Sequence, residues 1–381
     1  MNSLSKGKHL RKMAFGINQI LMNEFFGDVL DLNFINAITD ELKYKTKSSK
    51  RTQASLGHVQ IMLKEYMLSD FKQHFRMNRT TFQILLKEVA LEREQTKDID
   101  LESQLLFTLW ILGNQESLEV VANRFSIEKK WGQFVFEQCI QILSKLMPKY
   151  VKWQTEEEQA LTADIFEFKS RGIVGVTGVI DCCHIPIRRP LENSFDYYNV
   201  MNYHSVILQG VCDSAGKFMD VFIGMPGSIN DATVFRNSPL CMKKDRRLVG
   251  DVAYPLSTNL LTPYAKKDVT QFKAAHEIYN KRLNVLHSII VRALGLLVSR
   301  FRRLQYLDVK TPKAANYIIS ACCMLHNFIQ INEDTAEEDD IDEEAVSKIF
   351  MPPNNFVDNQ ICAEDAYEQR NFIKNRLNQS V

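Results

Sequence analysis

The amino-acid sequence predicts an α/β protein in which a helical N-terminal third precedes a strand-rich middle, a long helix and an acidic C-terminal segment. Three observations predict this order. Apolar residues recur at helical spacing up to about residue 150, β-branched residues and glycines dominate 173–251, and helical spacing returns before residue 330. At 381 residues and 45% hydrophobic content, the chain is long enough for two domains with a sizeable core.

The N-terminal third is predicted to contain a packed helix pair at 56–92 and then three shorter helices. The three helices are expected at 101–112, 117–125 and 128–143. Ser117 is the expected N-cap of the second helix, and Ser126 and Ile127 form a tight turn before the third. This order of short helices and tight turns is typical of a helix-turn-helix, whose last helix would place Lys129 and Lys130 near DNA phosphates. A three-helix bundle without DNA contact has the same periodicity, so both interpretations stay open.

Four short strands are expected in the middle of the chain, at 173–181, 206–213, 218–224 and 247–251, the second and third joined by a hairpin turn. The first strand ends in Asp181 and the fourth in Asp251. An aspartate at the end of a buried strand is desolvated unless it meets a cation or hydrogen-bond donors, so the pair indicates a shared cationic site. The alternative is that each aspartate only caps the following turn. We expect the two strands to be adjacent in one sheet, with the carboxylates facing each other across a small cleft.

Four ordered stretches of the sequence resemble the PIF/Harbinger-type DDE transposases. They read GVIDCCHIPIRRP, YYNVMNYHSVILQGVCDSAGKFMDVFIGMPGSINDATVFRNSPL, LVGDVAYPLSTNLLTPY and YNKRLNVLHSIIVRALGLLVSRFRRL. The N-terminal FRMNRTTFQILL and the helix-turn-helix pattern fit the same family, so the resemblance covers roughly residues 65 to 330. It implies an RNase H-like mixed sheet flanked by helices, the DDE transposase core, with an N-terminal all-α region.

The resemblance also implies a catalytic centre in which three acids hold two divalent ions, Mg²⁺ or Mn²⁺, for phosphodiester cleavage. By position the first metal-binding acid is Asp181 and the second is Asp251. The third acid falls at Val291, which cannot coordinate a cation, so metal binding is expected to be weak or absent. His287, one helical turn earlier, is a substitute ligand or an exposed helix histidine.

Two further acids, Asp231 and Glu277, lie near these motifs. Asp231, in the family-typical PGSIND, is expected to cap a helix beginning at Ala232. Glu277 is expected to precede the long helix altogether.

Composition excludes several classes of function. Lys and Arg total 47 against 46 Asp and Glu, so any DNA-binding surface must be local. Candidate phosphate contacts are Arg292, Arg300, Arg302 and Arg303 on the long helix and Lys243, Lys244, Arg246 and Arg247 before the second aspartate. A solvated charged face is the alternative for each. The longest apolar stretch, 288–301, is interrupted by arginines, and the N-terminus has no secretory pattern, so we expect a soluble protein without a membrane span.

The eight cysteines form no zinc-binding pattern and predict reduced thiols in a nuclear or cytosolic protein. The expected domains are 1–95 (helical), 96–150 (helix-turn-helix-like), 151–330 (DDE nuclease domain) and 331–381 (an acidic, flexible tail that would screen the basic clusters). The resemblance implies DNA and a Myb/SANT-like or MADF-like DNA-binding protein as partners and leaves oligomerisation open. Three functions compete: a catalytically impaired nuclear DNA or chromatin adaptor, an active metal-dependent nuclease, and a protein-interaction scaffold.

Overall fold

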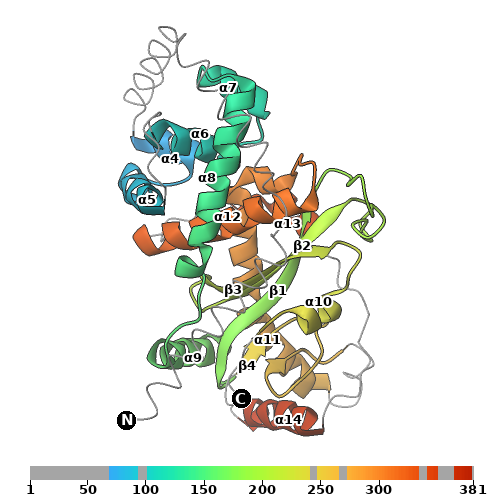
Figure 1. Ribbon diagram of the computed structural model, residues 1–381. Coiled ribbons are helices and arrows are strands. Elements are labelled where there is room, and N and C mark those ends of the chain that lie inside the picture. The colour runs from blue at the N-terminus through green and yellow to red at the C-terminus, as the bar shows by residue number, and fades with distance from the viewer. Residues whose placement is uncertain are drawn as a thin grey trace, which may run out of the picture. The chain divides into compact units, whose positions relative to one another are not determined.

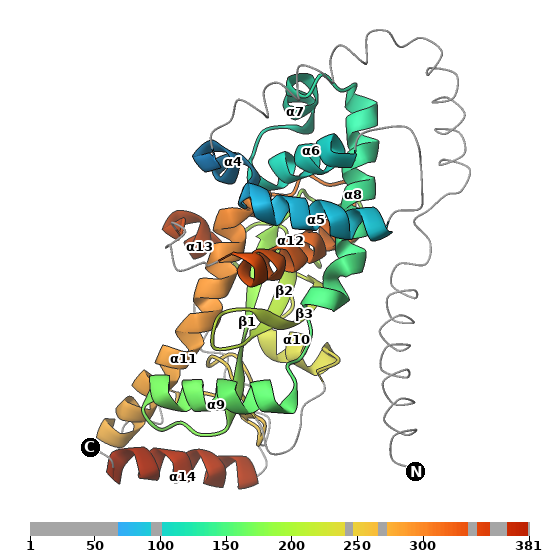
Figure 2. The same ribbon diagram turned by 90° about the vertical axis from the view of Figure 1, so that its left-hand side faces the viewer.

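The computed structural model describes residues 68–92, 101–240, 247–265, 273–333, 341–350 and 364–379 (Figures 1 and 2). By its internal contacts the chain divides into two compact units, Met1–Gln60 and Ile61–Val381, and every described residue belongs to the second. The predicted domain boundaries near residues 95, 150 and 330 all fall inside this second unit and stay predictions.

A five-stranded mixed sheet lies at the centre of the described part, in the order β3-β2-β1-β4-β5. Its strands are β1 (Val176–Pro186), β2 (Ser205–Cys212), β3 (Phe218–Pro226), β4 (Arg247–Val249) and β5 (Leu260–Leu261). β1 and β2 pair antiparallel, as do β2 and β3, whereas β4 runs parallel to both β1 and β5. The mixed sheet and the adjacency of the two aspartate-bearing strands confirm the predicted α/β class. β5 was not predicted, because two residues carry no periodicity.

The helices before the sheet lie close to where the sequence placed them. They are α4 (Leu68–Phe75), α5 (Arg79–Glu92), α6 (Leu101–Gly113), α7 (Leu118–Arg124) and α8 (Lys129–Tyr150). Ser117 caps α7 by accepting a hydrogen bond from the Val120 amide at 3.3 Å, and Ser126 adopts a positive φ of 55° in the tight turn. α8 runs seven residues further than expected because α12 holds its end: Asn327 Nδ2 donates to the Tyr150 carbonyl oxygen at 2.9 Å.

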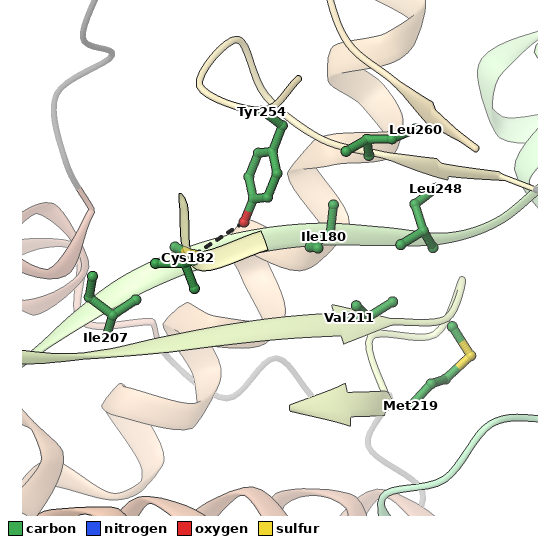
Figure 3. Packing of buried hydrophobic residues seen from close by; sticks show 9 residues of the cluster. Ile180, Cys182, Ile207, Val211, Met219, Leu248, Tyr254 and Leu260 are labelled. Atoms are coloured by element: carbon green, nitrogen blue, oxygen red, sulfur yellow. Dashed lines mark hydrogen bonds between the residues drawn. The ribbon is translucent and has the colours of Figure 1, made fainter. Parts of the chain in front are cut away.

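The later helices cover the two faces of the sheet. They are α9 (Glu156–Ser170), α10 (Asp231–Asn237), α11 (Lys273–Arg300), α12 (Pro312–Asn332), α13 (Glu343–Ile349) and α14 (Glu364–Gln379), with a short 3₁₀ helix at Arg302–Gln305. α11 and α12 contact β1, β2 and β3, and α10 lies on the other side of the strands from α11 (Figure 2). On the α10 side, Ile180, Val211 and Leu248 pack with Tyr254 in a buried apolar cluster (Figure 3).

α11 is long and apolar enough, over Ala274–Arg300, to cross a membrane by length and composition alone. In the structure it packs on β1 and β2 and also contacts α9 and α14, as expected of a core helix. At Gly210 of β2 a Cβ would lie within ordinary contact distance of Ile290 of α11, at 3.6 Å, but only 3.1 Å from the ring of Phe218 in β3.

The described part of the C-terminal segment differs from the predicted flexible tail, because α13 and α14 pack against α11. The amide of Asp342 donates to Ser299 Oγ at 2.9 Å, and Val346 lies so close to Gly295 that a Cβ there would approach it to 3.1 Å. Tyr264 Oη donates to Asn371 Oδ1 of α14 at 2.8 Å. A strongly acidic composition thus did not prevent the few apolar residues of this segment from docking.

Candidate functional site

The parallel register of β1 and β4 brings Asp181 and Asp251 to the same level of the sheet. The last paired residues are Val179 and Val249, and each aspartate follows two residues later. Asp181 nevertheless lies in the middle of β1 rather than at its end, which corrects the predicted strand 173–181. β1 continues to Pro186 because β2 pairs with it up to Ser205.

Asp181 is a buried carboxylic acid, with 6% of the residue exposed. Burial, together with the neighbouring carboxylates of Asp251 and Asp231, raises its pKa well above the ordinary value. One hydrogen bond opposes this shift, because Asp181 Oδ1 accepts the Cys182 amide at 2.8 Å. Such mutual repulsion between buried acids is what a bound cation would relieve.

Asp251 lies just beyond β4 in a turn. Its Oδ1 accepts the Ala253 amide at 2.9 Å, which is the turn-capping contact that the sequence allowed as an alternative role. Burial raises the pKa of Asp251 as well. The residue therefore caps a turn and stands beside Asp181, and the two interpretations do not exclude each other.

Asp231 is the third carboxylate of this neighbourhood. It is the first residue of α10 and not its cap: Asn230 is the N-cap and accepts the Thr233 amide at 2.9 Å, which corrects the predicted role of Asp231. Burial and the charge of Asp251 raise its pKa to about 7, against a hydrogen bond from Cys182 that lowers it. Cys182 Sγ also lies 3.1 Å from Tyr254 Oη (Figure 3).

His287 of α11 faces Asp181 from the helix side of the sheet. Its Nε2 lies 3.4 Å from Asp181 Oδ2, and 17% of its side chain is exposed. The interpretation of His287 as an exposed helix histidine is therefore wrong, because α11 packs closely on β1 and β2 at this point. Burial lowers the pKa of His287 to about 4, so the imidazole is neutral near pH 7.

Val291 and Glu277 both lie on α11. Val291 is half-buried, one turn beyond His287, and offers no ligand atom. Glu277 lies inside α11 rather than before it, since the helix begins at Lys273, and its side chain is exposed. It lies about three turns before His287, too far along the helix to substitute for a carboxylate at Val291.

The predicted DNA contacts divide into two groups. Arg292, Arg302 and Lys130 are exposed, and Lys129 is exposed but forms an ion pair with Glu119. Arg303 donates to the carbonyl oxygens of Ile111 and Glu116.

Arg300 is buried, with 7% of the residue exposed, and its Nη1 lies 3.4 Å from His326 Nδ1. The sequence assigned Arg300 and Arg303 to phosphates, whereas the structure engages both with other parts of the fold. Lys243, Lys244 and Arg246 lie outside the described residues, and Arg247 is half-buried at the start of β4.

The donor chemistry of this centre fits a divalent cation, because Asp181 and Asp251 are oxygen ligands removed from solvent and the charge of Asp251 raises the pKa of Asp181. These two acids would hold the ion, which supplies water activation and charge neutralisation when bound. Within the described ranges, however, no three His, Cys, Asp or Glu side chains are spaced to ligate one ion. The centre therefore keeps two of its acids without a third ligand in place.

The stretch of the chain that contains this centre is similar to known proteins. Residues 180–327, from β1 to α12, match the family described as DDE superfamily endonuclease. HARBI1 of Mus musculus is 28% identical over 279 residues, which cover 69% of this chain and 77% of that protein. Residues 180–327 therefore resemble a DDE superfamily endonuclease domain, and the chain is homologous to Harbinger transposase-derived proteins.

Two plant proteins extend this Harbinger-type relationship. Protein ALP1-like of Arabidopsis thaliana is 26% identical over 301 residues, covering 71% of this chain and 72% of its own length. Antagonist of like heterochromatin protein 1, from the same plant, is 24% identical over 300 residues, covering 71% and 75%. No solved structure matches the chain. DDE endonucleases depend in general on divalent metal ions and have DNA as substrate or partner, so this similarity suggests the same ligands here.

The sequence left two roles open for His287, a substitute ligand and an exposed helix histidine, and the structure places it beside Asp181. The only available signal was the spacing of four residues between His287 and Val291, which puts both on neighbouring turns of one helix face. Whether that face points at the aspartates depends on how α11 packs, and packing is not encoded in helical periodicity alone.

Proposed function

We propose that this Harbinger-type chain is a catalytically impaired nuclease that acts as a DNA- or chromatin-binding adaptor in the nucleus. The observation that carries the proposal is Val291, an aliphatic residue at the position where the family places its third carboxylate. Asp181 and Asp251 remain beside each other in the sheet, so the scaffold is preserved while the ligand set is incomplete.

The loss of one metal ligand should strongly reduce metal-dependent cleavage but have little effect on the surfaces that contact DNA. Removing an outer-shell partner of a metal typically costs about 10- to 100-fold in affinity or activity, and losing a direct ligand costs at least as much. Two-metal cleavage also needs both ions to stabilise the attacking and leaving oxygens. We therefore expect weak binding of Mg²⁺ or Mn²⁺ and little or no cleavage, with DNA contacts retained.

The DNA-binding part of the proposal rests on three exposed cations. Arg292 is exposed on α11, Arg302 on the 3₁₀ helix that follows it, and Lys130 at the start of α8. Because three such cations give modest affinity, we propose that a Myb/SANT-like or MADF-like protein supplies additional DNA contacts and aids nuclear entry. A cytoplasmic fraction is compatible with this dependence. The name of the plant relative, an antagonist of a heterochromatin protein, supports a chromatin role.

The test compares the full chain with Val291→Glu and Asp181→Ala on supercoiled and nicked DNA, with Mg²⁺ and with Mn²⁺. We expect no cleavage by the unchanged chain and a gain of cleavage when the carboxylate is restored at position 291. Metal-dependent cleavage by the unchanged chain that Asp181→Ala abolishes would refute impairment.

The second candidate function is an active divalent-metal-dependent DNA nuclease that uses Asp181 and Asp251. The burial of these two acids and their proximity favour it, because burial raises the pKa of both and the charge of Asp251 raises the pKa of Asp181 further. A scaffold that contacts only proteins is the third. Affinity purification from nuclei, with mapping of bound chromatin, separates the adaptor from the scaffold, since only the adaptor recovers DNA.

A further inference from the structure

The contact between His287 and Asp181 is unusual for a histidine–carboxylate pair. The distance from His287 Nε2 to Asp181 Oδ2 is 3.4 Å, longer than the roughly 2.7–3.2 Å of an N–H···O hydrogen bond. Nε2 is fully buried and has no hydrogen-bond partner among the described residues. A buried polar atom without a partner is costly, and native proteins normally satisfy it with water, an ion or another group.

We infer that His287 and Asp181 form a nitrogen–oxygen ligand pair for a transition-metal ion of the zinc class, in place of the family's all-carboxylate magnesium centre. This inference rests on the proposed function, in which the loss of the third acid has ended magnesium-dependent cleavage. The pair joins α11 to β1, so a bound ion would fasten the helix to the sheet.

The spacing of the two ligand atoms leaves room for one shared ion. Zinc binds imidazole nitrogen at about 2.0–2.1 Å and carboxylate oxygen at about 2.0–2.2 Å, so two ligands at the tetrahedral angle stand about 3.4 Å apart. The distance between His287 Nε2 and Asp181 Oδ2 is 3.4 Å, which accommodates such an ion.

The chemistry of the two atoms points the same way. Imidazole nitrogen is a common ligand of zinc, copper, iron and nickel, whereas magnesium prefers oxygen. Asp181 uses Oδ1 for the Cys182 amide and presents Oδ2 to His287, so one oxygen is engaged with the backbone and the other faces the imidazole. Within the described ranges no three His, Cys, Asp or Glu side chains are arranged to hold one ion, so solvent would fill the remaining positions. We therefore expect a single open site of modest affinity.

The experiment measures metal binding by the full, chelator-treated chain, with Zn²⁺, Mn²⁺ and Mg²⁺ each added alone in calorimetric titrations. We expect one Zn²⁺ per chain, bound more tightly than Mg²⁺, and a loss of affinity of at least about tenfold in His287→Ala and in Asp181→Asn. Co²⁺ gives a second readout, because a tetrahedrally coordinated Co²⁺ ion absorbs visible light. His287→Ala should abolish this absorption.

Two further variants control for Zn²⁺ binding outside the site and for misfolding. His204→Ala removes another histidine that lies outside the site and should leave Zn²⁺ affinity unchanged. His287→Gln keeps a polar side chain of similar size, so it serves if His287→Ala does not fold. Unchanged Zn²⁺ affinity in the folded His287 variant would overturn the inference, as would Zn²⁺ binding no tighter than that of Mg²⁺. Cleavage of DNA by the unchanged chain with Mg²⁺ would instead overturn the proposed function, so the two failures are distinguishable.

Discussion

Replacing Asp231 by asparagine should stabilise the metal-free protein at neutral and alkaline pH. Asp231 is largely buried beside other carboxylates, and its pKa is raised from 3.8 to about 7. One pKa unit corresponds to about 1.4 kcal/mol, so ionising this group in the folded state costs about 4 kcal/mol at most. Because the folded state holds the proton more tightly than the unfolded state, this cost is absent below about pH 4, grows as the pH rises, and is complete above about pH 7.

Asp231→Asn keeps an acceptor oxygen for Cys182 and removes the charge, so we expect roughly 2–4 kcal/mol of added stability at pH 8 and close to none at pH 4. The measurement is urea unfolding, followed by circular dichroism, with a chelator present throughout. Asp164→Asn, at an exposed carboxylate of α9, is the matched control and should change little at either pH. An equal effect of Asp231→Asn at both pH values, or a loss of stability at pH 8, would refute the reasoning about buried charge.

Three other predictions concern DNA binding and packing. Arg292→Ala with Arg302→Ala should weaken binding to all sequences and reduce the slope of log affinity against log salt by about two, whereas Arg303→Ala should lower the unfolding midpoint without changing that slope. Neutralising the acidic residues of 342–344 to Asn and Gln should raise DNA affinity by roughly two- to tenfold at low salt, because this segment docks on α11 between the two exposed arginines. Gly227→Ala should cost roughly 1–3 kcal/mol in urea unfolding, since its Cβ would lie 2.7 Å from the Tyr197 carbonyl oxygen.

Each of these has an outcome that contradicts it. An unchanged salt slope in the arginine double variant, measured by fluorescence anisotropy, would make those residues a solvated face. Unchanged affinity after charge neutralisation would separate α13 from DNA binding. The change of Asp342 to Asn keeps its cap on the Ala345 amide, so a loss of helix would not confuse that result. A normal unfolding midpoint for Gly227→Ala would show that the backbone at the end of β3 can move aside.

Local chemistry explains why the helix and strand positions could be predicted. Ser117 caps α7 because its hydroxyl can accept an amide hydrogen bond, a property visible in one residue and its neighbours. The short apolar runs 206–213 and 218–224, joined by a hairpin turn, likewise predicted β2 and β3 to within two residues at each boundary. The sequence misplaced the end of β1, since Pro186 stays in the sheet only through its pairing with Ser205 of β2.

The sequence by itself determined the α/β class and the adjacency expected of the Asp181 and Asp251 strands, because both depend on residue type and spacing. The resemblance to the transposase family placed the missing third acid at Val291. Only the tertiary structure decided which side chains meet. In the folded protein Arg300 is buried, and Arg303 donates a hydrogen bond to the Ile111 carbonyl oxygen. His287 Nε2 lies 3.4 Å from Asp181 Oδ2. The physical reason is that helical periodicity defines one face of a helix but not what that face packs against, and the packing of α11 on β1 and β2 is a tertiary contact.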